Sequence, residues 1–339
     1  MKPIAITLGD PAGIGPEIIA KAFRDAPDAV RGCFVAGDVA AMRRAVQGVG
    51  REGRAAIPVA RIDGPAQALA LPPRCIGVLQ VTPEGELPVL GQVSARAGRM
   101  AADCVRWAAR AALQGDVAAL VTAPLHKEAL AAAGEPFPGH TELLQAETAR
   151  HLGVPVAQMP VRMMLANDEL RTVLVSIHMS LRDAIQAVTR DNVLQTLQIA
   201  DAALRRVLGR TPRIAAAGLN PHAGEGGLFG REELDTIIPA VDAARAQGLD
   251  VSGPLAPDTV FMRARRGEFD AVVAMYHDQG LIPVKYLGVE LGVNVTLGLP
   301  LVRTSPDHGT AFDIAGTGRA DASSLVQALH MARRLRACA

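Results

Sequence analysis

Three histidines occupy similar positions in the chain and could share one metal ion. His178 follows RTVLVSI, His222 follows RIAAAGLNP and His277 follows AVVAMY, so each comes after a hydrophobic run and before polar or glycine-rich residues. Enzymes of the α/β class place their sites at such strand ends. Neutral imidazoles from separate strands can bind one divalent ion and leave positions open for a substrate, as in catalytic metal sites.

The spacing and chemistry of these histidines narrow the choice of metal. Intervals of 44 and 55 residues exclude a zinc-finger type of site. Imidazole ligands suit Zn²⁺, Co²⁺ or Mn²⁺ better than Mg²⁺. Taken singly, each histidine is more typical of a structural residue, and that interpretation stays open at this point.

A second group of residues has the chemistry of an anion site. In PGHTE, Gly139 permits a turn, and Thr141, after His140, can cap the following helix and offer N–H groups to an anion. Three polar residues then recur nine positions apart, at Lys285, Asn294 and Arg303. A lysine and an arginine flanking a buried strand are unusual unless they meet an anion. The simpler alternatives are a plain helix cap and solvated strand ends.

A cofactor segment is expected near the carboxyl end. TSPDHGTAFDIAGTG, residues 304–318, offers many N–H donors and little bulk before a helix. Asp313 can accept the hydroxyls of a ribose and would repel a 2′-phosphate, which favours NAD⁺ over NADP⁺. The GxGxxG string at Gly48, Gly50 and Gly53 follows a helix-like run, so we predict a surface turn there. The N-terminal GDPAGIGPE is in a better context but has the wrong spacing, and it predicts a tight turn that can support a site.

Bulk composition indicates a globular protein with about two domains. The chain has 339 residues, 49% hydrophobic and 20% charged, with a net charge of +1, which gives no sign of a nucleic-acid or membrane-surface partner. The start of the chain lacks the apolar core of a signal peptide, and no apolar run is long enough to span a membrane. We therefore expect a cytoplasmic protein. Its scattered cysteines, without CxxC spacing, are expected to be reduced: Cys33, Cys75, Cys104 and Cys338.

The order of expected elements indicates an α/β fold. Strands alternate with helices, which favours a largely parallel sheet, while the β-rich runs 161–166 and 171–177, joined by NDEL, predict a hairpin and therefore a mixed sheet. Ser94 can cap a long helix that Gly115 ends. The stretch 48–73, rich in glycine, proline and arginine, is predicted to be irregular.

Eight strings, in order along essentially the whole chain, resemble the 4-hydroxythreonine-4-phosphate dehydrogenase family of vitamin B6 synthesis. They are LGDPAGIGPE, TAPLHKEAL, PGHTE, SIHMSL, LNPHAGEGG, PDTVF, MYHDQGLIPVK and GVNVTLGLPLVRTSPDHGTAFDIAG. The last also resembles the HGSAPDIAG cofactor loop of isopropylmalate and isocitrate dehydrogenases. The resemblance implies their two-lobed α/β/α fold with an active-site cleft. In that fold, 1–135 plus 255–339 form a nucleotide-binding lobe, and 136–254 form a central lobe for substrate and metal binding and for dimerisation.

The resemblance also assigns roles to residues. It implies a homodimer with the active site near the subunit interface and one divalent ion per subunit, Zn, Co, Mn or Mg, bound by the three histidines. Substrate-binding positions fall on His140, Thr141, Lys285, Asn294 and Arg303. The NAD or NADP loop falls on His308, Gly309, Thr310, Ala311 and Asp313.

The implied reaction is the oxidation of 4-phosphooxy-L-threonine at C3, followed by decarboxylation to 3-amino-2-oxopropyl phosphate. Lys285 and Asp278 are the candidates for the group that takes the hydroxyl proton. Relatives that oxidise phosphorylated threonate or erythronate, or an aromatic dihydrodiol, are the nearest alternatives. A metal-dependent hydrolase is the alternative from another class, but it leaves the 304–318 segment without a role.

Overall fold

The computed structural model describes residues 2–49 and 57–336, and these form two compact units. Unit 1 contains the described residues up to Pro160 together with Leu299–Arg336, and unit 2 is Val161–Gly298. The central lobe expected at 136–254 therefore begins and ends earlier in the chain than unit 2 does. The roles assigned to the lobes stay a prediction.

Unit 1 is built on an all-parallel sheet with the strand order β3-β4-β2-β1-β5-β12. Its strands are β1 (Ile4–Thr7), β2 (Cys33–Gly37), β3 (Val59–Ile62), β4 (Ile76–Gln80), β5 (Ala119–Thr122) and β12 (Arg303–Pro306). Every residue of β1, β2 and β5 is buried, as expected for parallel strands covered on both faces.

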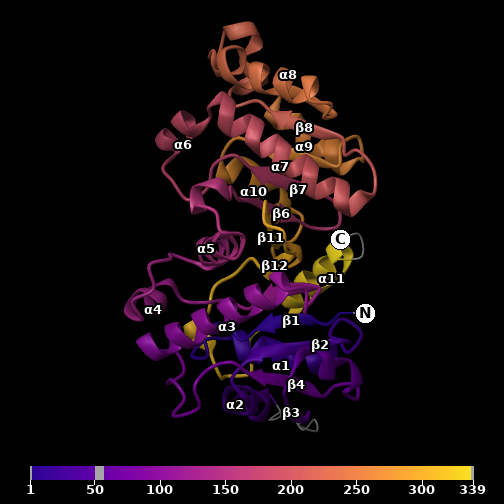
Figure 1. The fold of residues 1–339 in the computed structure, drawn as a ribbon. Helices are drawn as coiled ribbons and strands as arrows, with labels where there is room; N and C mark the ends of the chain where they lie inside the picture. Colours follow the sequence, from indigo (N-terminus) through magenta and orange to yellow (C-terminus); the bar gives the residue numbers. More distant parts are fainter. Residues whose placement is uncertain (1, 50–56, 337–339) are drawn as a thin grey trace. The chain divides into compact units, whose positions relative to one another are not determined.

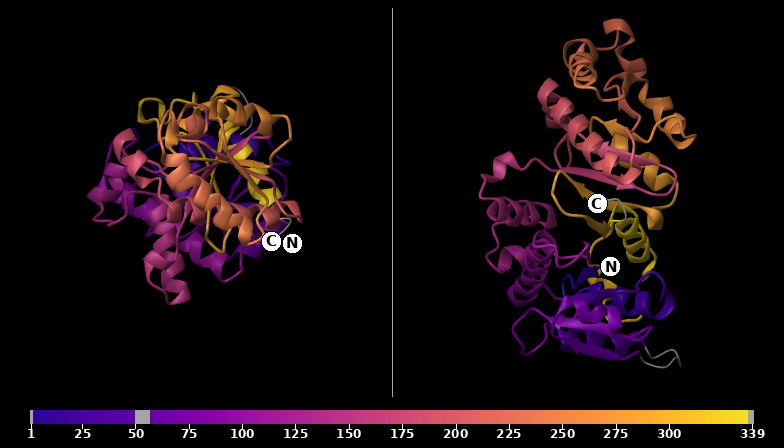
Figure 2. Two further views of the ribbon diagram at one scale, coloured as in Figure 1. Left: turned by 90° about the horizontal axis from the view of Figure 1, so that it is seen from above. Right: turned by 45° about the vertical axis from the view of Figure 1, so that its right-hand side comes forward.

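The helices of unit 1 form two groups (Figures 1 and 2). One group is α3 (Ala95–Leu113), α4 (Lys127–Ala132) and α5 (His140–Leu152), and the other is α1 (Gly15–Asp25), α2 (Val39–Val49) and α11 (Ser323–Arg336). Ser94 caps α3 by accepting a hydrogen bond from the Ala97 N–H at 3.2 Å, which confirms that expectation. Gly98 brings α3 close to α4, because a Cβ at this position would lie 1.9 Å from the Ala129 carbonyl oxygen.

The expectation of an irregular stretch at 48–73 is wrong in part. β3 and a short 3₁₀ helix, Pro65–Ala70, both lie within it. β3 is a four-residue edge strand with one buried residue, so its sequence carries little hydrophobic signal. Gly50 and Gly53 of the GxGxxG string lie outside the described residues.

Unit 2 has a mixed sheet with the order β11-β6-β7-β10-β8-β9. Its strands are β6 (Arg162–Ala166), β7 (Arg171–Leu174), β8 (Ile214–Ala217), β9 (Val251–Leu255), β10 (Ala271–Ala274) and β11 (Val293–Leu297). β6 pairs antiparallel with both β7 and β11, which confirms the hairpin and the mixed sheet, while β7, β10, β8 and β9 are parallel.

The helices of unit 2 complete its core. They are α6 (Leu181–Ala187), α7 (Arg190–Leu208), α8 (Ile238–Ala246), α9 (Pro257–Arg265) and α10 (His277–Tyr286), with a π-helical turn at Glu233–Ile237 before α8. Leu174 and Val272 of the sheet pack with Val260 of α9 and Leu281 of α10 in one buried cluster. No helix within 2–49 or 57–336 is long and apolar enough to cross a membrane.

Candidate active site

The three candidate metal ligands follow three neighbouring parallel strands of unit 2. His178 comes four residues after β7, His277 begins α10 after β10, and His222 lies in the turn Pro221–Gly227 after β8. The sheet order β7-β10-β8 brings these carboxyl ends to one edge. This edge is where parallel α/β sheets place ligands.

Two of the three imidazoles lie close together. The ring centroids of His178 and His277 are 5.7 Å apart, a separation compatible with a shared ion. The Nδ1 of His277 lies 2.6 Å from a carboxylate oxygen of Asp278, and such a contact fixes the orientation of a ligating imidazole and leaves Nε2 for a metal. Among the described residues, no three His, Cys, Asp or Glu side chains approach closely enough to hold an ion. The assignment of the trio thus stays a prediction.

The backbone around two of these histidines is strained. His178 has φ of 23° and His222 has φ of 53°, both in the left-handed region. The run continues from His222 through Ala223, Gly224, Glu225 and Gly226, all with positive φ. Each non-glycine residue in this conformation costs about 1–2 kcal/mol, so the surrounding structure must hold the turn. Strain of this kind is concentrated at functional sites.

In unit 1, the predicted anion residues Arg303 and His140 are brought together. Arg303 begins β12 and is 3% exposed. Its Nε and Nη2 donate to the Thr122 hydroxyl oxygen at 3.1 and 2.8 Å. Burial lowers the pKa of Arg303 to about 10, and the charge of Glu142 opposes this shift. A guanidinium held in such an environment attracts an anion.

His140 is held neutral beside this guanidinium. Burial and the charge of Arg303 lower the pKa of His140 well below its ordinary value, and a hydrogen bond with the Ala123 backbone opposes this. The Nε2 of His140 is buried without a hydrogen-bond partner. A buried polar atom of this kind needs a partner, and a substrate oxygen would supply one.

Thr141 does not cap α5, contrary to the sequence-based expectation. Gly139 is the N-cap, without a side-chain hydrogen bond, and His140 and Thr141 are the first two helical residues. Gly139 is extended at φ −173°, so the helix begins two residues earlier than a threonine cap at position 141 would require. Thr141 nevertheless lies in the first helical turn, where N–H groups favour an anion.

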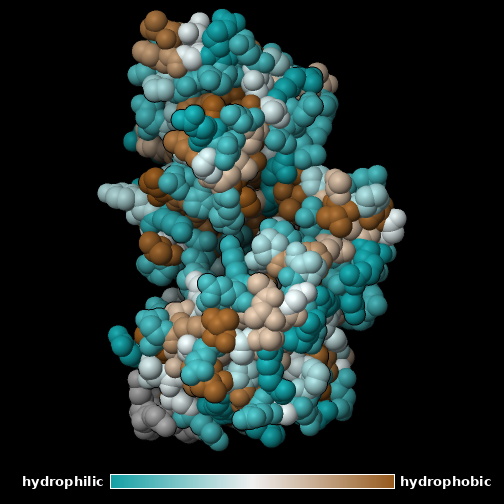
Figure 3. All heavy atoms as spheres, turned by 90° about the vertical axis from the view of Figure 1, so that its left-hand side faces the viewer, coloured by the Kyte–Doolittle hydropathy of each residue, from teal (hydrophilic) through white to brown (hydrophobic). Residues whose placement is uncertain are grey.

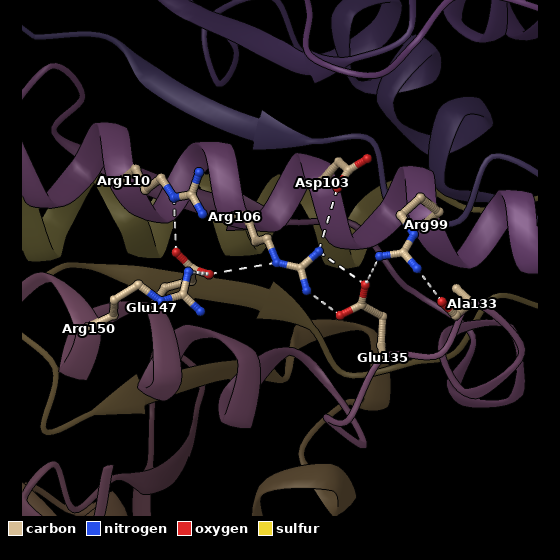
Figure 4. A network of polar contacts seen from close by, with 8 residues as sticks. All are labelled: Arg99, Asp103, Arg106, Arg110, Ala133, Glu135, Glu147 and Arg150. Carbon is tan, nitrogen blue, oxygen red and sulfur yellow. Dashed lines mark hydrogen bonds and ion pairs between the residues drawn. The ribbon is translucent and has the colours of Figure 1, made fainter. Parts of the chain in front are cut away.

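A network of arginines and carboxylates fixes α5 on α3 (Figure 4). Glu135, just before α5, and Glu147, within it, each have a side chain that is 2% exposed. Arg106 of α3 contacts both: its guanidinium forms a two-pronged pair with Glu135, and its Nε lies 3.7 Å from Glu147. Arg99 also binds Glu135, whereas Arg110 and Arg150 bind Glu147. The segment that carries His140 and Thr141 is thereby fastened to α3 on both sides.

The predicted cofactor segment packs against the N-terminal turn of unit 1. The Ile14 N–H donates to the Thr310 carbonyl at 3.0 Å, and a Cβ on Gly13 would lie 2.9 Å from the Thr310 Cβ. Phe312 stacks on His126, with ring centroids 4.6 Å apart. Gly13 also lines a pocket of about 210 Å³, together with Pro11, Arg44, Leu90 and Gly316, among others. The tight turn predicted at GDPAGIGPE therefore supports the loop.

The individual residues of the loop differ in exposure. Ala311 has φ of 40° and precedes a 3₁₀ turn, Phe312–Ile314, that exposes Asp313. Thr310 is buried, and His308 and Gly309 are exposed. Exposed backbone and an exposed carboxylate are compatible with nucleotide binding.

The remaining predicted residues lie in unit 2. Lys285 is in the last turn of α10, half-buried, and Asn294 lies half-buried in β11. The sequence analysis did not select Thr122, whose hydroxyl binds Arg303. Thr122 is the last residue of the buried strand β5 and the first of TAPLHKEAL. Its position at a strand end was the signal that could have identified it.

Comparison with known proteins identifies the family. The model of "Pyridoxal phosphate biosynthetic protein PdxA" matches residues 29–332. The chain belongs to this family. It is 52% identical to a 4-hydroxythreonine-4-phosphate dehydrogenase of Beijerinckia indica, covering 98% of this chain and 95% of that one. A D-threonate 4-phosphate dehydrogenase of Pectobacterium atrosepticum is 45% identical, over 98% and 99% of the two chains.

A crystal structure agrees with this assignment. The 4-hydroxythreonine-4-phosphate dehydrogenase of Klebsiella pneumoniae superposes with a TM-score of 0.87 at 43% identity, covering 99% of this chain and all of the other. The resemblance and the α/β fold with a mixed, largely parallel sheet are confirmed. The protein is a dehydrogenase of the pyridoxal phosphate biosynthetic family.

Proposed function

We propose that the protein oxidises 4-phosphooxy-L-threonine at C3 with NAD⁺ and that the keto acid then loses CO₂ to give 3-amino-2-oxopropyl phosphate. The observation that carries this proposal is the 52% identity, along 98% of the chain, to a protein named for that substrate. The positive charge of the buried Arg303 beside the unsatisfied Nε2 of His140 supports it, because a phosphorylated acid is an anion and would supply an oxygen to that nitrogen.

A second candidate substrate is D-threonate 4-phosphate. Relatives named for it are 45–48% identical over nearly the full length. This compound has the same terminal phosphate and carboxylate but a hydroxyl in place of the amino group. His140, Thr141, Lys285, Asn294 and Arg303 recognise the shared anions in either case, so they do not separate the two substrates.

A divalent ion bound by His178, His222 and His277 would lower the pKa of the C3 hydroxyl and polarise the resulting carbonyl. The donor set fits Zn²⁺, Co²⁺ or Mn²⁺. Asp278 orients the His277 ring through its 2.6 Å contact, which favours Lys285 as the group that accepts the hydroxyl proton. The nicotinamide would accept the hydride, and Asp313 favours NAD⁺.

A homodimer is part of the proposal. Unit 2 exposes several large apolar side chains, among them Leu228 (73%), Ile282 (63%), Tyr286 (89%) and Val289 (63%). Figure 3 shows hydrophobic groups exposed among hydrophilic ones on one face of the molecule. Ile282 and Tyr286 lie four residues apart on α10 and therefore on one face of that helix. Exposed apolar side chains of this kind are typical of an interface, and we assign them to a second copy of the chain.

The test is the absorbance of reduced nicotinamide with NAD⁺, a divalent ion and each phosphorylated substrate in turn. A rise with 4-phosphooxy-L-threonine that a chelator abolishes is expected, and a rise only with D-threonate 4-phosphate would move the protein to the second candidate. His222→Ala should abolish turnover and leave the circular dichroism spectrum unchanged. Full activity of that variant in the presence of chelator would contradict the metal assignment.

A further inference from the structure

Side chains that are not themselves candidate ligands join the three histidine-bearing strand ends of unit 2. Ser176, two residues before His178, donates its hydroxyl to the Met275 carbonyl at 3.0 Å. The Met275 N–H donates to the Gln279 side-chain oxygen at 2.7 Å, and the Gln279 amide donates to the Gly218 carbonyl at 2.7 Å. β7, β10 and β8 are thus connected just before the residues that carry the imidazoles.

Glu233 continues this connection into the His222 turn. It is 1% exposed and lies in the π-helical turn before α8. One of its oxygens accepts the N–H groups of Leu219 and Asn220, both at 2.7 Å. The other accepts the Asn220 side-chain amide at 2.9 Å. A single buried carboxylate therefore satisfies three donors immediately before the left-handed run.

Close packing shows that the turn is shaped around this carboxylate. A Cβ on Gly224 would lie 2.6 Å from one Glu233 oxygen, and a Cβ on Gly218 would lie 3.2 Å from the other. The Asn220 carbonyl also accepts the Ala223 N–H at 3.1 Å, which links the anchored residue to the strained segment. Because left-handed non-glycine residues relax unless their surroundings fix them, His222 depends on Glu233 for its position.

We propose that Glu233 and Gln279 are positioning residues that fix the strand ends bearing His222 and His277, so that these imidazoles can serve as ligands of a divalent ion. This inference rests on the proposed metal site, and it assigns to that site two supporting residues that contribute no ligand. Removing a hydrogen-bond partner that orients a metal ligand typically weakens metal binding about 10- to 100-fold.

The experiment measures Co²⁺ binding to the full-length protein by titration calorimetry and by visible absorption, without substrate. Glu233→Gln preserves size but places an amide donor opposite other donors, and it should weaken Co²⁺ binding about 10- to 100-fold. Glu232→Gln is the matched control, because Glu232 is the preceding residue and accepts from the Asn220 side chain, at 2.7 Å, whereas the Leu219 and Asn220 N–H groups bind Glu233. We expect its affinity to change less than about twofold.

Gln279→Met provides an independent variant that removes both hydrogen bonds while retaining length. It should weaken Co²⁺ binding and alter the absorption band, with NAD⁺ affinity and the circular dichroism spectrum unchanged. Should the unaltered protein fail to bind Co²⁺, the proposed metal site itself is wrong. If it binds Co²⁺ and folded Glu233→Gln and Gln279→Met bind as tightly, the positioning role is refuted and the metal site stands.

Discussion

Replacing Arg106 by glutamine should destabilise unit 1 more than replacing any other arginine of the α3–α5 network. The side chain of Arg106 is 20% exposed, and it contacts two carboxylates whose own side chains are 2% exposed. Its loss removes a two-pronged pair with Glu135 and the contact with Glu147. Breaking a buried pair costs about 3–5 kcal/mol. Because Arg99 still binds Glu135 at 2.7 Å, we expect a smaller loss, about 2–3 kcal/mol.

Arg110→Gln is the matched control, since Arg110 is on the same helix, pairs with Glu147 but not with Glu135, and is 55% exposed. Pairs of that exposure contribute about 0–1 kcal/mol. Trp107, the single tryptophan, lies next to Arg106 and packs edge-on against Phe34, so its fluorescence reports the unfolding of unit 1 in urea.

Arg106→Lys keeps the positive charge but lacks the planar guanidinium, so its urea midpoint should lie between those of the two glutamine variants. Because the network fastens the segment that carries His140, Arg106→Gln should also raise the KM for the phosphorylated substrate more than Arg110→Gln does. Equal urea midpoints for the two glutamine variants would refute the reasoning, because burial would then have no influence on the strength of these pairs.

Three further predictions concern unit 1. Gly98→Ala should lower stability by about 1–3 kcal/mol, because its Cβ would lie 1.9 Å from the Ala129 carbonyl oxygen; Gly64→Ala, with nothing within 4 Å, should not shift the urea midpoint measurably. The pKa of His140 is lowered in the folded protein, so the unfolded chain binds its proton at higher pH and stability should fall as pH drops below about 6.5. His140→Gln should reduce this pH dependence, measured as the difference between urea midpoints at about pH 7.5 and about pH 5.5. An unchanged difference would show that His140 is not the group responsible. Arg303→Lys should reduce kcat/KM for the phosphorylated substrate about 10- to 100-fold, and steady-state kinetics showing no change would exclude Arg303 from substrate binding.

Much of the architecture follows from local sequence patterns. The buried run at Ile4–Thr7, the Ser94 cap and the β6–β7 hairpin are visible because burial and capping leave their mark on adjacent residues. The three histidines could be selected for the same reason, since each follows a hydrophobic run. β3 could not be predicted, because an edge strand with one buried residue has almost no hydrophobic pattern.

The supporting contacts depended on tertiary structure alone. Arg106 meets Glu135 across 29 residues, and Gln279 meets Gly218 across 61, so neither partner can be inferred from spacing. The same holds for His140, whose neutral state is set by its burial beside Arg303. Sequence by itself identified the residues with chemistry to offer, because their types and strand-end positions are local properties. Which carboxylate, amide or hydroxyl holds each of them was decided only when the chain packed, because desolvation and hydrogen bonding depend on neighbours distant in sequence.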